Sequence, residues 1–329
     1  MSAPEPNISV QVERREPAPA AGTAAGQRPH PNTCPSCSSH YRDEELTASL
    51  RVCTVCGHHF PVGALMRIDQ IADAGSFDEI ARDVRSADPL GFVDLKPYVD
   101  RLAAAEAVTG LDDAVVVGSA TLAGRPVVLA AMDFSFLGGS MGSVVGEKLA
   151  RACDLAVELD SPLITVTASG GARMQENVLA LMQMAKTVTS IDGLHDAGVP
   201  YLSVLAHPTT GGVMASFAAL GDVILAEPGA LMSFAGPRVV QQTTREELPA
   251  DFGRAESNYR DGHVDLLVPR GELREMLARL LGLLLGPVGS VEIETSEAAT
   301  PLSRGPIRRL LRRLRRHGHG PASSNGAPA

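Results

Sequence analysis

Aromatic residues are scarce in this chain: Trp is absent, and Phe and Tyr together make up 4% of 329 residues. Proteins that bind single-stranded nucleic acid stack bases on aromatic side chains, so the composition offers few such platforms. Acidic residues outnumber basic ones by 38 to 29, and this net charge of -9 disfavours a general attraction to nucleic acid or to an anionic membrane. The sequence also lacks an apolar run of about 18 residues, the length that spans a bilayer, and its first 32 residues lack a signal-peptide core. We therefore expect a cytoplasmic protein.

The two ends of the chain differ in composition from the rest. Residues 1–32 are rich in Pro, Ala and Gly and show no hydrophobic period, which predicts a disordered tail. Residues 291–329 are predicted to form a second, flexible tail, and within it residues 301–320 carry seven Arg and no acid. The apolar spacing there also fits a basic amphipathic helix for an acidic partner, a membrane surface or nucleic acid. A solvated tail fits equally well, so we assign it no role.

Four of the five cysteines fall in two C-x2-C pairs separated by fifteen residues. Such pairs each place two thiolates on one edge of a tetrahedron, and two pairs complete a closed, structural zinc site. The spacing predicts a zinc ribbon over residues 33–60 whose zinc contributes the folding energy that so short a segment lacks. The remaining thiol, Cys153, lies among apolar residues and is expected in the core. The predicted ligands are Cys34, Cys37, Cys53 and Cys56.

Residues 61–290 alternate between strand and helix patterns, with apolar runs of strand length followed by Gly-containing turns and helical periodicity. Such repeated strand–turn–helix units predict an α/β fold with a mainly parallel sheet. We expect a hairpin at 115–121 and 126–134, strands at 163–167, 201–205, 223–225, 231–234 and 264–268, and helices at 141–159, 174–195, 213–220 and 272–285.

Two glycine pairs, Gly170-Gly171 and Gly211-Gly212, are predicted where a strand ends and a helix begins. Backbone N–H groups without side-chain cover, together with a helix N-terminus, can stabilise negative charge that develops on a substrate oxygen. The same pattern also fits tight turns that need a positive φ, and spacing alone favours neither interpretation. His207, beside the second pair, is either a base or a structural residue.

Several familiar site motifs are missing, including the phosphate loop, the G-x-S-x-G elbow and H-E-x-x-H. The turn Gly138-Gly139-Ser140-Met141 is similar to a phosphate-binding turn before a helix, but it lacks the dinucleotide fingerprint. The sequence motifs therefore leave the glycine pairs as the candidates for chemistry.

Four long segments occur in order behind the cysteine pairs, and together they resemble the carboxyltransferase beta subunit of bacterial multisubunit acetyl-CoA carboxylase. This resemblance runs from about Cys34 to Leu285 and implies a crotonase-like fold, in which ββα units wind into a superhelix behind an N-terminal four-cysteine zinc ribbon. The segments are FLGGSMGSVVGEKLARA (136–152), ASGGARMQENVLALMQMAKT (168–187), LAHPTTGGVMASFAALGDVILAEPGALMSFAGPRVVQQT (205–243) and LPADFGRAES (248–257).

The resemblance implies an enzymatic activity in fatty acid synthesis: transfer of a carboxyl group from carboxybiotin, on a separate carrier protein, to acetyl-CoA, giving malonyl-CoA. An enolate and the biotin ureido oxygen both need stabilising, and backbone N–H donors suit both. The implied donors are Gly170, Gly171, Gly211 and Gly212, and the family pattern usually has Asp where His207 stands.

The resemblance also implies residues that bind the substrate. Arg173, Arg238 and Arg245 are candidates to contact the phosphates or thioester region of coenzyme A, since Arg makes forked phosphate contacts. An interdomain salt bridge is the favoured interpretation for Arg245. The implied wall of the acyl pocket consists of Gly138, Gly139, Ser140 and Met141.

The chain carries neither a biotin-attachment sequence nor an ATP-grasp signature, so the resemblance implies other chains as partners. These are a carboxyltransferase alpha subunit, in an α2β2 complex, the biotin carboxyl carrier protein and biotin carboxylase. Two alternatives stay open: a carboxyltransferase for propionyl-CoA or another acyl-CoA, and a nucleic-acid-binding regulator that uses the ribbon and the Arg-rich tail. The segment between the cysteine pairs supports nucleic-acid binding weakly, because it is not basic and has one aromatic residue.

Overall fold

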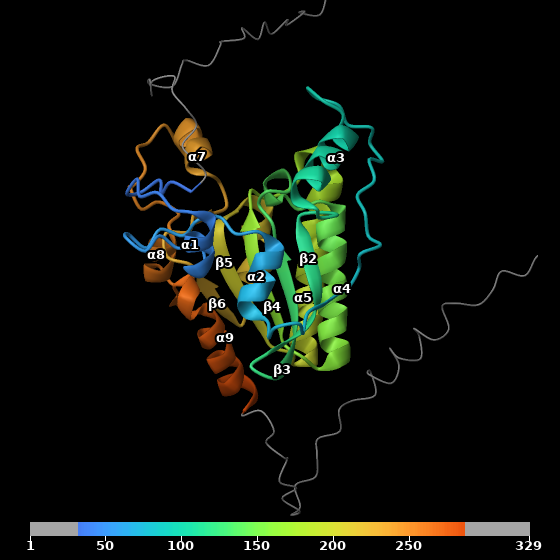
Figure 1. Cartoon of the computed structure of the whole chain (residues 1–329). Helices are drawn as coiled ribbons and strands as arrows, with labels where there is room; N and C mark the ends of the chain where they lie inside the picture. Colours follow the sequence, from blue (N-terminus) through green and yellow to red (C-terminus); the bar gives the residue numbers. More distant parts are fainter. Residues whose placement is uncertain (1–31, 287–329) are drawn as a thin grey trace, which may run out of the picture. The chain divides into compact units, whose positions relative to one another are not determined.

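The computed structural model describes residues 32–286, so both expected tails lie outside the described residues except for Asn32. Within this range the strands form one eight-stranded sheet in the order β1-β2-β3-β4-β5-β6-β8, with β7 paired to β5 (Figure 1). No helix in this range is long and apolar enough to cross a membrane.

The expected hairpin is confirmed. Its strands are β2 (Val115–Leu122) and β3 (Arg125–Met132), which pair antiparallel. The two turn residues, Ala123 and Gly124, both have positive φ, the backbone twist that a two-residue hairpin needs. A short strand, β1 (Asp78–Glu79), pairs antiparallel with the outer side of β2.

The rest of the sheet is parallel, as the repeated units predicted. From β3 it continues through β4 (Leu163–Ser169), β5 (Tyr201–Thr210) and β6 (Val223–Ala226). Two short strands complete it: β7 (Met232–Ser233) beside β5 and β8 (Leu266–Leu267) beside β6. Every residue of β4 is buried, which is typical of a parallel strand covered on both faces.

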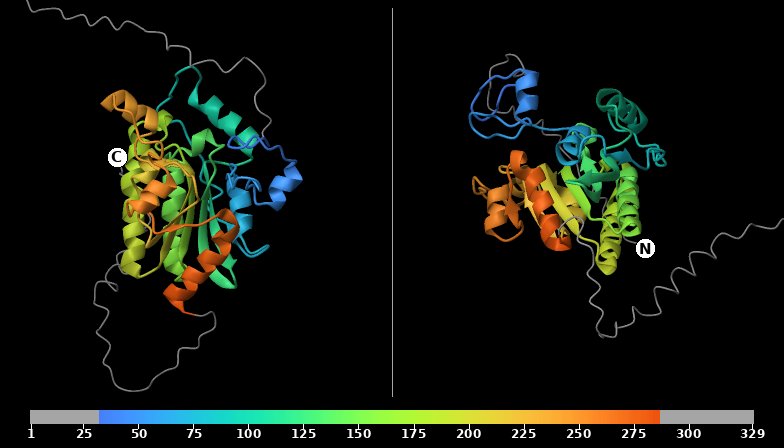
Figure 2. Two further views of the ribbon diagram at one scale, coloured as in Figure 1. Left: turned by 90° about the vertical axis from the view of Figure 1, so that its left-hand side faces the viewer. Right: turned by 60° about the horizontal axis from the view of Figure 1, so that its bottom comes forward.

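Long helices cover the sheet. α4 (Ser143–Leu159) and α5 (Val178–Ala197) pack side by side, and α4 also contacts β2 and β3 (Figure 2). α2 (Ala64–Ile71) packs on the same two strands and contacts α9 (Arg270–Leu285). The last six residues of β3 are consequently buried.

Two expected elements differ from the prediction. β5 extends to Thr210, so residues 208–210, expected at the start of a turn over 208–212, are the end of a strand. The helix expected at 213–220 is a single turn, α6 (Gly211–Met214), followed by the 3-10 turn η3 (Phe217–Ala219). The break falls at Ser216, which leaves helical geometry at φ -131 and ψ -120 and whose hydroxyl donates to the carbonyl of Gly212. Short-range competition of this kind is common for Ser.

The helix expected at 174–195 is also divided. It begins as the 3-10 turn η2 (Met174–Glu176) and continues as α5 after Asn177, whose φ of 49 interrupts the helical path. Within residues 32–286, five further helical elements were not predicted from the sequence. These are α1 (Asp43–Ala48), α3 (Tyr98–Thr109), η1 (Leu137–Gly139), α7 (Pro237–Thr244) and α8 (Ala255–Arg260). Most of them are too short to show a helical spacing of apolar residues, and α3 shows little of it.

Candidate functional site

The two glycine pairs lie against each other, because they follow adjacent parallel strands, β4 and β5. A Cβ added to Gly171 would lie 3.1 Å from the Cα of Gly211, and a Cβ added to Gly211 would lie 3.0 Å from the Cα of Gly171. Both residues have positive φ, +115 and +60 respectively, which disfavours any side chain. Glycine at both positions is therefore what allows the two turns to touch.

Three of the four glycine N–H groups expected as oxyanion donors already donate within the fold. Gly170 N–H donates to the carbonyl of Gly138 at 2.8 Å, and Gly211 N–H donates to that of Phe234 at 2.9 Å. Gly171 N–H donates to Ser169 Oγ at 3.0 Å. These N–H groups of Gly170, Gly171 and Gly211 hold the turns together.

The N–H groups of Gly212 and Ala172 make no hydrogen bond within residues 32–286. They are close neighbours: a Cβ on Gly212 would lie 3.5 Å from the nitrogen of Ala172, and a Cβ on Gly171 would lie 3.2 Å from the nitrogen of Gly212. Two adjacent unpaired N–H groups, fixed before reaction, can stabilise charge on a single oxygen. Gly212 is among the candidate donors named from the sequence, but Ala172, whose side chain carries no signal, is not.

The helix termini beside the glycine pairs add less stabilisation of negative charge than the sequence suggested. Gly211 and Gly212 open α6, which has only four residues, and two residues separate Gly171 from η2. A macrodipole needs aligned peptides over several turns, so neither pair lies at the start of a long helix dipole.

The expected wall segment lies directly beside the first glycine pair. Met141 N–H donates to the carbonyl of Gly171 at 2.8 Å, and Arg173 N–H donates to the carbonyl of Met141 at 2.9 Å. Gly139 packs on the end of β4, where a Cβ would lie only 2.0 Å from the carbonyl oxygen of Ala168. The Met141 side chain is fully buried, so it supports the wall from behind.

Arg173 does not fit the expected contact with coenzyme A. Its side chain is 0% exposed, and it forms a bidentate pair with the equally buried Asp113 at 2.6 and 2.8 Å. Burial alone would lower the pKa of Arg173, but Asp113 outweighs it and raises that pKa. A cation buried and paired in this way presents no open face to a substrate phosphate.

The other candidate arginines lie on or beside α7. Arg238 lies near its beginning, and the Arg238 side chain is outside the described part of the structure. Arg245 is the exposed residue that ends the helix, with left-handed φ of 60.

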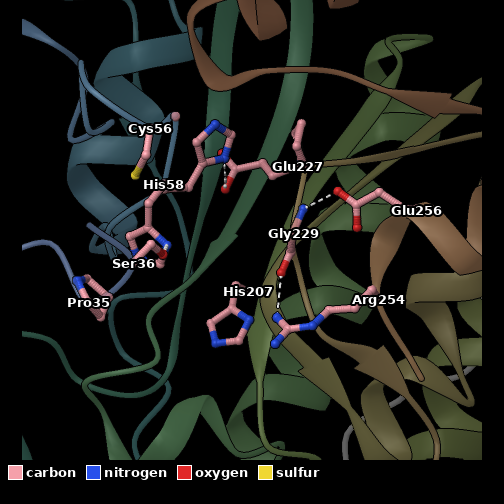
Figure 3. A pocket seen from close by; sticks show the side chains of 12 residues that line it. Pro35, Ser36, Cys56, His58, His207, Glu227, Gly229, Arg254 and Glu256 are labelled. Carbon is pink, nitrogen blue, oxygen red and sulfur yellow. Dashed lines mark hydrogen bonds and ion pairs between the residues drawn. The ribbon is translucent and has the colours of Figure 1, made fainter. Parts of the chain in front are cut away.

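His207 lines a cavity of about 590 Å³ between the ribbon and the body, together with His58 and Arg254 (Figure 3). Its Nδ1 accepts the N–H of Leu231 at 3.0 Å, a contact that fixes the chain just before β7. Burial, with a smaller contribution from the charge of Arg254, lowers the pKa of His207 and favours the neutral ring that this bond needs. The geometry thus supports the structural interpretation of His207.

The four expected metal ligands converge on one point. The four Sγ atoms lie within 4.8 Å of one another, and those of Cys34 and Cys56 are 3.5 Å apart. A tetrahedral zinc with Zn–S bonds of about 2.3 Å needs S–S separations of about 3.8 Å, so the geometry fits such an ion. The cluster could hold a metal ion.

The two halves of the ribbon repeat the same backbone pattern. Cys34 N–H donates to the carbonyl of Ser39, and Cys53 N–H donates to that of His58, both at 2.8 Å. The ribbon's own hydrophobic core consists only of Cys34, Leu46, Cys53 and Phe60, with Tyr41 packed against it. So small a core needs a further source of stability, which a metal bound by the four cysteines would supply.

Comparison with known proteins identifies the family. The carboxyl transferase domain matches residues 63–280, which includes both glycine pairs and the wall segment. An acetyl-coenzyme A carboxylase carboxyl transferase subunit beta from Thermus thermophilus is 54% identical over 248 residues, covering 75% of this chain and 87% of the relative. The chain belongs to this family of carboxyl transferase beta subunits.

Another relative of the family joins two subunits in one chain. It is named acetyl-coenzyme A carboxylase carboxyl transferase subunits beta/alpha, comes from Saccharopolyspora erythraea, and is 49% identical over 268 residues. The match covers 82% of the present chain and 47% of the relative, so the chain spans about half of that protein.

Solved structures confirm the expected crotonase-like carboxyltransferase fold. The transcarboxylase 12S structure with methylmalonyl-coenzyme A bound has a TM-score of 0.58 and 28% identity, over 68% of this chain and 41% of that one. A Pseudomonas malonate decarboxylase hetero-tetramer in complex with malonate has a TM-score of 0.56 and 27% identity, over 80% and 92% of the two chains. Both neighbours are assemblies of several chains.

Proposed function

We propose that this chain is the beta subunit of an acetyl-CoA carboxylase carboxyltransferase. In this reaction the bond between the carboxyl carbon and a biotin nitrogen would break, a bond would form from that carbon to the methyl carbon of acetyl-CoA, and the proton lost by the methyl group would go to the biotin nitrogen. Bound biotin supplies the activated carboxyl group, and we propose a separate carrier protein as its source. Family membership and the paired free N–H groups of Ala172 and Gly212 support the proposal.

Ala172 and Gly212 have a defined role in this proposal. When acetyl-CoA loses a methyl proton, negative charge develops on its thioester oxygen. Two N–H donors aimed at that oxygen stabilise the enolate without transferring a proton, and they need no reorganisation during the reaction. Residues 138–140 form the wall beside them, and Arg173 supports this wall from the protein interior.

A second negative charge, on the biotin ureido oxygen, needs donors of its own. We propose that these come from a carboxyltransferase alpha subunit in an α2β2 complex, with biotin carboxylase and the carrier protein completing the enzyme. The fused beta/alpha relative and the hetero-tetrameric neighbour support a second chain of this kind. We place the complex in the cytoplasm, as expected from the sequence.

Acetyl-CoA is the favoured substrate because the curated relatives at 49–54% identity carry the acetyl-CoA carboxylase name. The transcarboxylase bound to methylmalonyl-CoA is more distant, at 28% identity, and gives less support to a larger acyl group. The nucleic-acid-binding alternative is not favoured, because membership of the carboxyl transferase family and the paired free N–H groups both support an enzyme subunit. We propose zinc as the structural metal of the ribbon.

The decisive experiment reconstitutes the chain with an alpha subunit and measures malonyl-CoA-dependent carboxylation of a free biotin derivative. We expect activity from the complex and almost none from either chain alone. Gly212→Ala tests the donor pair, because its methyl group would lie 3.1 Å from Met184 Sδ and 3.4 Å from the Cβ of Ala172, and the shift needed to relieve these contacts would move the two N–H groups relative to each other. The variant keeps the Gly212 N–H but displaces it, and a displacement of about 1 Å costs about 10²-fold in kcat.

Gly193→Ala is the matched control, because Gly193 lies within α5 and a Cβ there would meet nothing within 4 Å. We expect this variant to retain wild-type activity. Full activity in Gly212→Ala would remove the donor pair from the mechanism, and full activity of the beta chain alone would remove the need for a partner.

A further inference from the structure

Arg173 is the largest fully buried side chain in the described structure, and each of its five N–H bonds has an acceptor. Nη1 donates to Asp113 Oδ2 at 2.8 Å and to Tyr98 Oη at 3.1 Å. Nη2 donates to Asp113 Oδ1 at 2.6 Å and to the carbonyl of Ser140 at 2.7 Å, while Nε donates to Ser140 Oγ at 3.1 Å. The guanidinium therefore joins the buried start of the hairpin to the wall segment.

The backbone of Arg173 also hydrogen-bonds to the wall segment, residues 138–141. Its N–H donates to the carbonyl of Met141, and Met141 N–H donates to the carbonyl of Gly171. These two bonds flank Ala172 in a parallel bridge, so the N–H of Ala172 points away from the wall segment. The side chain and the backbone of Arg173 together thus fix the Gly171–Ala172 peptide, which carries the free N–H of Ala172.

Glu176 secures the segment at its far end. Its carboxylate accepts the N–H of Ser143 at 2.6 Å and also the hydroxyl of Tyr98 at 2.8 Å. Because Tyr98 also accepts from Arg173, one continuous network links the residues after β4 with the residues before α4.

Stability alone does not account for such a network. A buried ion pair costs desolvation that its Coulomb attraction only partly offsets, and well-packed apolar side chains are often as stable. A planar guanidinium that is fixed at five points does, however, hold two segments in one relative position, which apolar packing does less sharply. The arrangement is therefore better suited to positioning than to stabilisation.

We infer that Arg173, oriented by Asp113, is a positioning residue that fixes the direction of the Ala172 N–H toward the reacting oxygen. This inference rests on the proposed function of Ala172 and Gly212 as donors. Arg173 itself touches no substrate, since its side chain is completely buried.

The test compares Arg173→Lys with Arg270→Lys in the assembled complex. Arg270 is a matched control, because it is 4% exposed and its guanidinium makes a bidentate pair with Glu227, but it lies at the ribbon junction. In both variants a lysine retains the charge and loses the planar fork. Both should lower Tm, and kcat and KM for malonyl-CoA are measured per folded molecule well below Tm.

For Arg173→Lys we expect kcat to fall by about 10- to 100-fold, because displacing the Ala172 N–H by up to about 1 Å costs a rate factor of this size. KM should stay within about threefold of wild type. Arg270→Lys should keep kcat within about threefold. Wild-type kcat in Arg173→Lys, or an equal loss in both variants, would overturn the inference.

A second measurement does not depend on activity. Amide hydrogen exchange of the full-length wild-type and Arg173→Lys chains, followed by mass spectrometry, should show faster exchange at residues 139–143 and 171–173 in the variant only. Unchanged exchange there would refute the positioning role. If the wild-type complex failed to transfer carboxyl groups, the proposed function would fail, while the exchange comparison would still decide whether Arg173 orders these segments.

Discussion

Replacing Glu227 by Gln should destabilise the junction between ribbon and body severely. Glu227 is 1% exposed, and its carboxylate accepts two bonds from Arg67, at 2.5 and 2.8 Å, and two from Arg270, both at 2.8 Å. Arg270 Nη1 also donates to three carbonyls of the ribbon, those of Leu50, Arg51 and Phe60. One carboxylate is thus the shared counter-ion of two buried arginines, and one of these, Arg270, holds the ribbon.

The magnitude follows from the burial of these charges. Breaking a buried ion pair by removing one partner costs about 3–5 kcal/mol, since the remaining charge is left uncompensated. Gln keeps the shape of the side chain but removes the charge, so both arginines lose their counter-ion. For a domain of this size, about 2–4 °C of Tm per kcal/mol gives an expected decrease of about 6–20 °C.

Thermal unfolding at pH 7 with zinc present measures this decrease, and Glu256→Gln serves as the control. Glu256 is exposed and lines the same cavity as Glu227, the one between the ribbon and the body. Its carboxylate accepts one hydrogen bond, from Gly229 N–H, so loss of its charge should cost less than about 1 kcal/mol. If Glu227→Gln cost no more than Glu256→Gln, the buried cluster would not be what holds the ribbon to the body.

The pH dependence provides an independent check of the same cluster. Burial alone would raise the pKa of Glu227, but the hydrogen bonds and charges of Arg270 and Arg67 outweigh it and hold that pKa well below 4.5. A carboxyl whose folded pKa is depressed stabilises the fold above its unfolded pKa, and this contribution is lost as pH falls below about 4.5. The stability of Glu227→Gln should therefore fall less steeply with acid than that of the wild type.

Three further predictions concern the wall, the metal and His207. Gly139→Ala should lower the free energy of unfolding by about 2 kcal/mol or more in chemical denaturation and should also lower carboxyl transfer. The reason is that its Cβ would lie 2.0 Å from the Ala168 carbonyl oxygen, at a φ of +62. Gly138→Ala is the control: its φ is similar, +68, but its Cβ would enter open space, so it should cost only about 1 kcal/mol. Equal losses would contradict the close approach. Chelation should release one zinc per chain and unfold the ribbon while near-UV circular dichroism of the body persists; metal analysis that finds no zinc in the native protein would refute the site. His207→Ala should lose about 1 kcal/mol with its bond to Leu231 N–H, whereas His207→Asp, which keeps an acceptor, should lose less; equal Tm values for the two variants would argue against this bond.

Those parts of the fold that depend on local pattern were predictable from the sequence. The hairpin around Ala123-Gly124 and the buried apolar strand β4 each carry their own signal, in turn chemistry and in an unbroken apolar run. The four cysteines likewise specify a metal geometry by spacing, and the structure brings their sulfur atoms together. The end of β5 was not predictable, because its residues 208–210 resemble a turn and become a strand only by pairing with β4 and β7.

The site shows where sequence reasoning must stop. The two glycine pairs lie where two backbones approach, because contact between Gly171 and Gly211 requires the absence of side chains. Which N–H groups remain free is a different question, since it depends on acceptors supplied by distant residues such as Gly138 and Phe234. Together with the nearby hydroxyl of Ser169, these acceptors engage three of the four glycines and leave a donor on Ala172, a residue whose type says nothing of its role. For a site built from peptide groups, the residue types reveal where the backbone can be exposed, and only the tertiary hydrogen-bond pattern reveals which peptides can act.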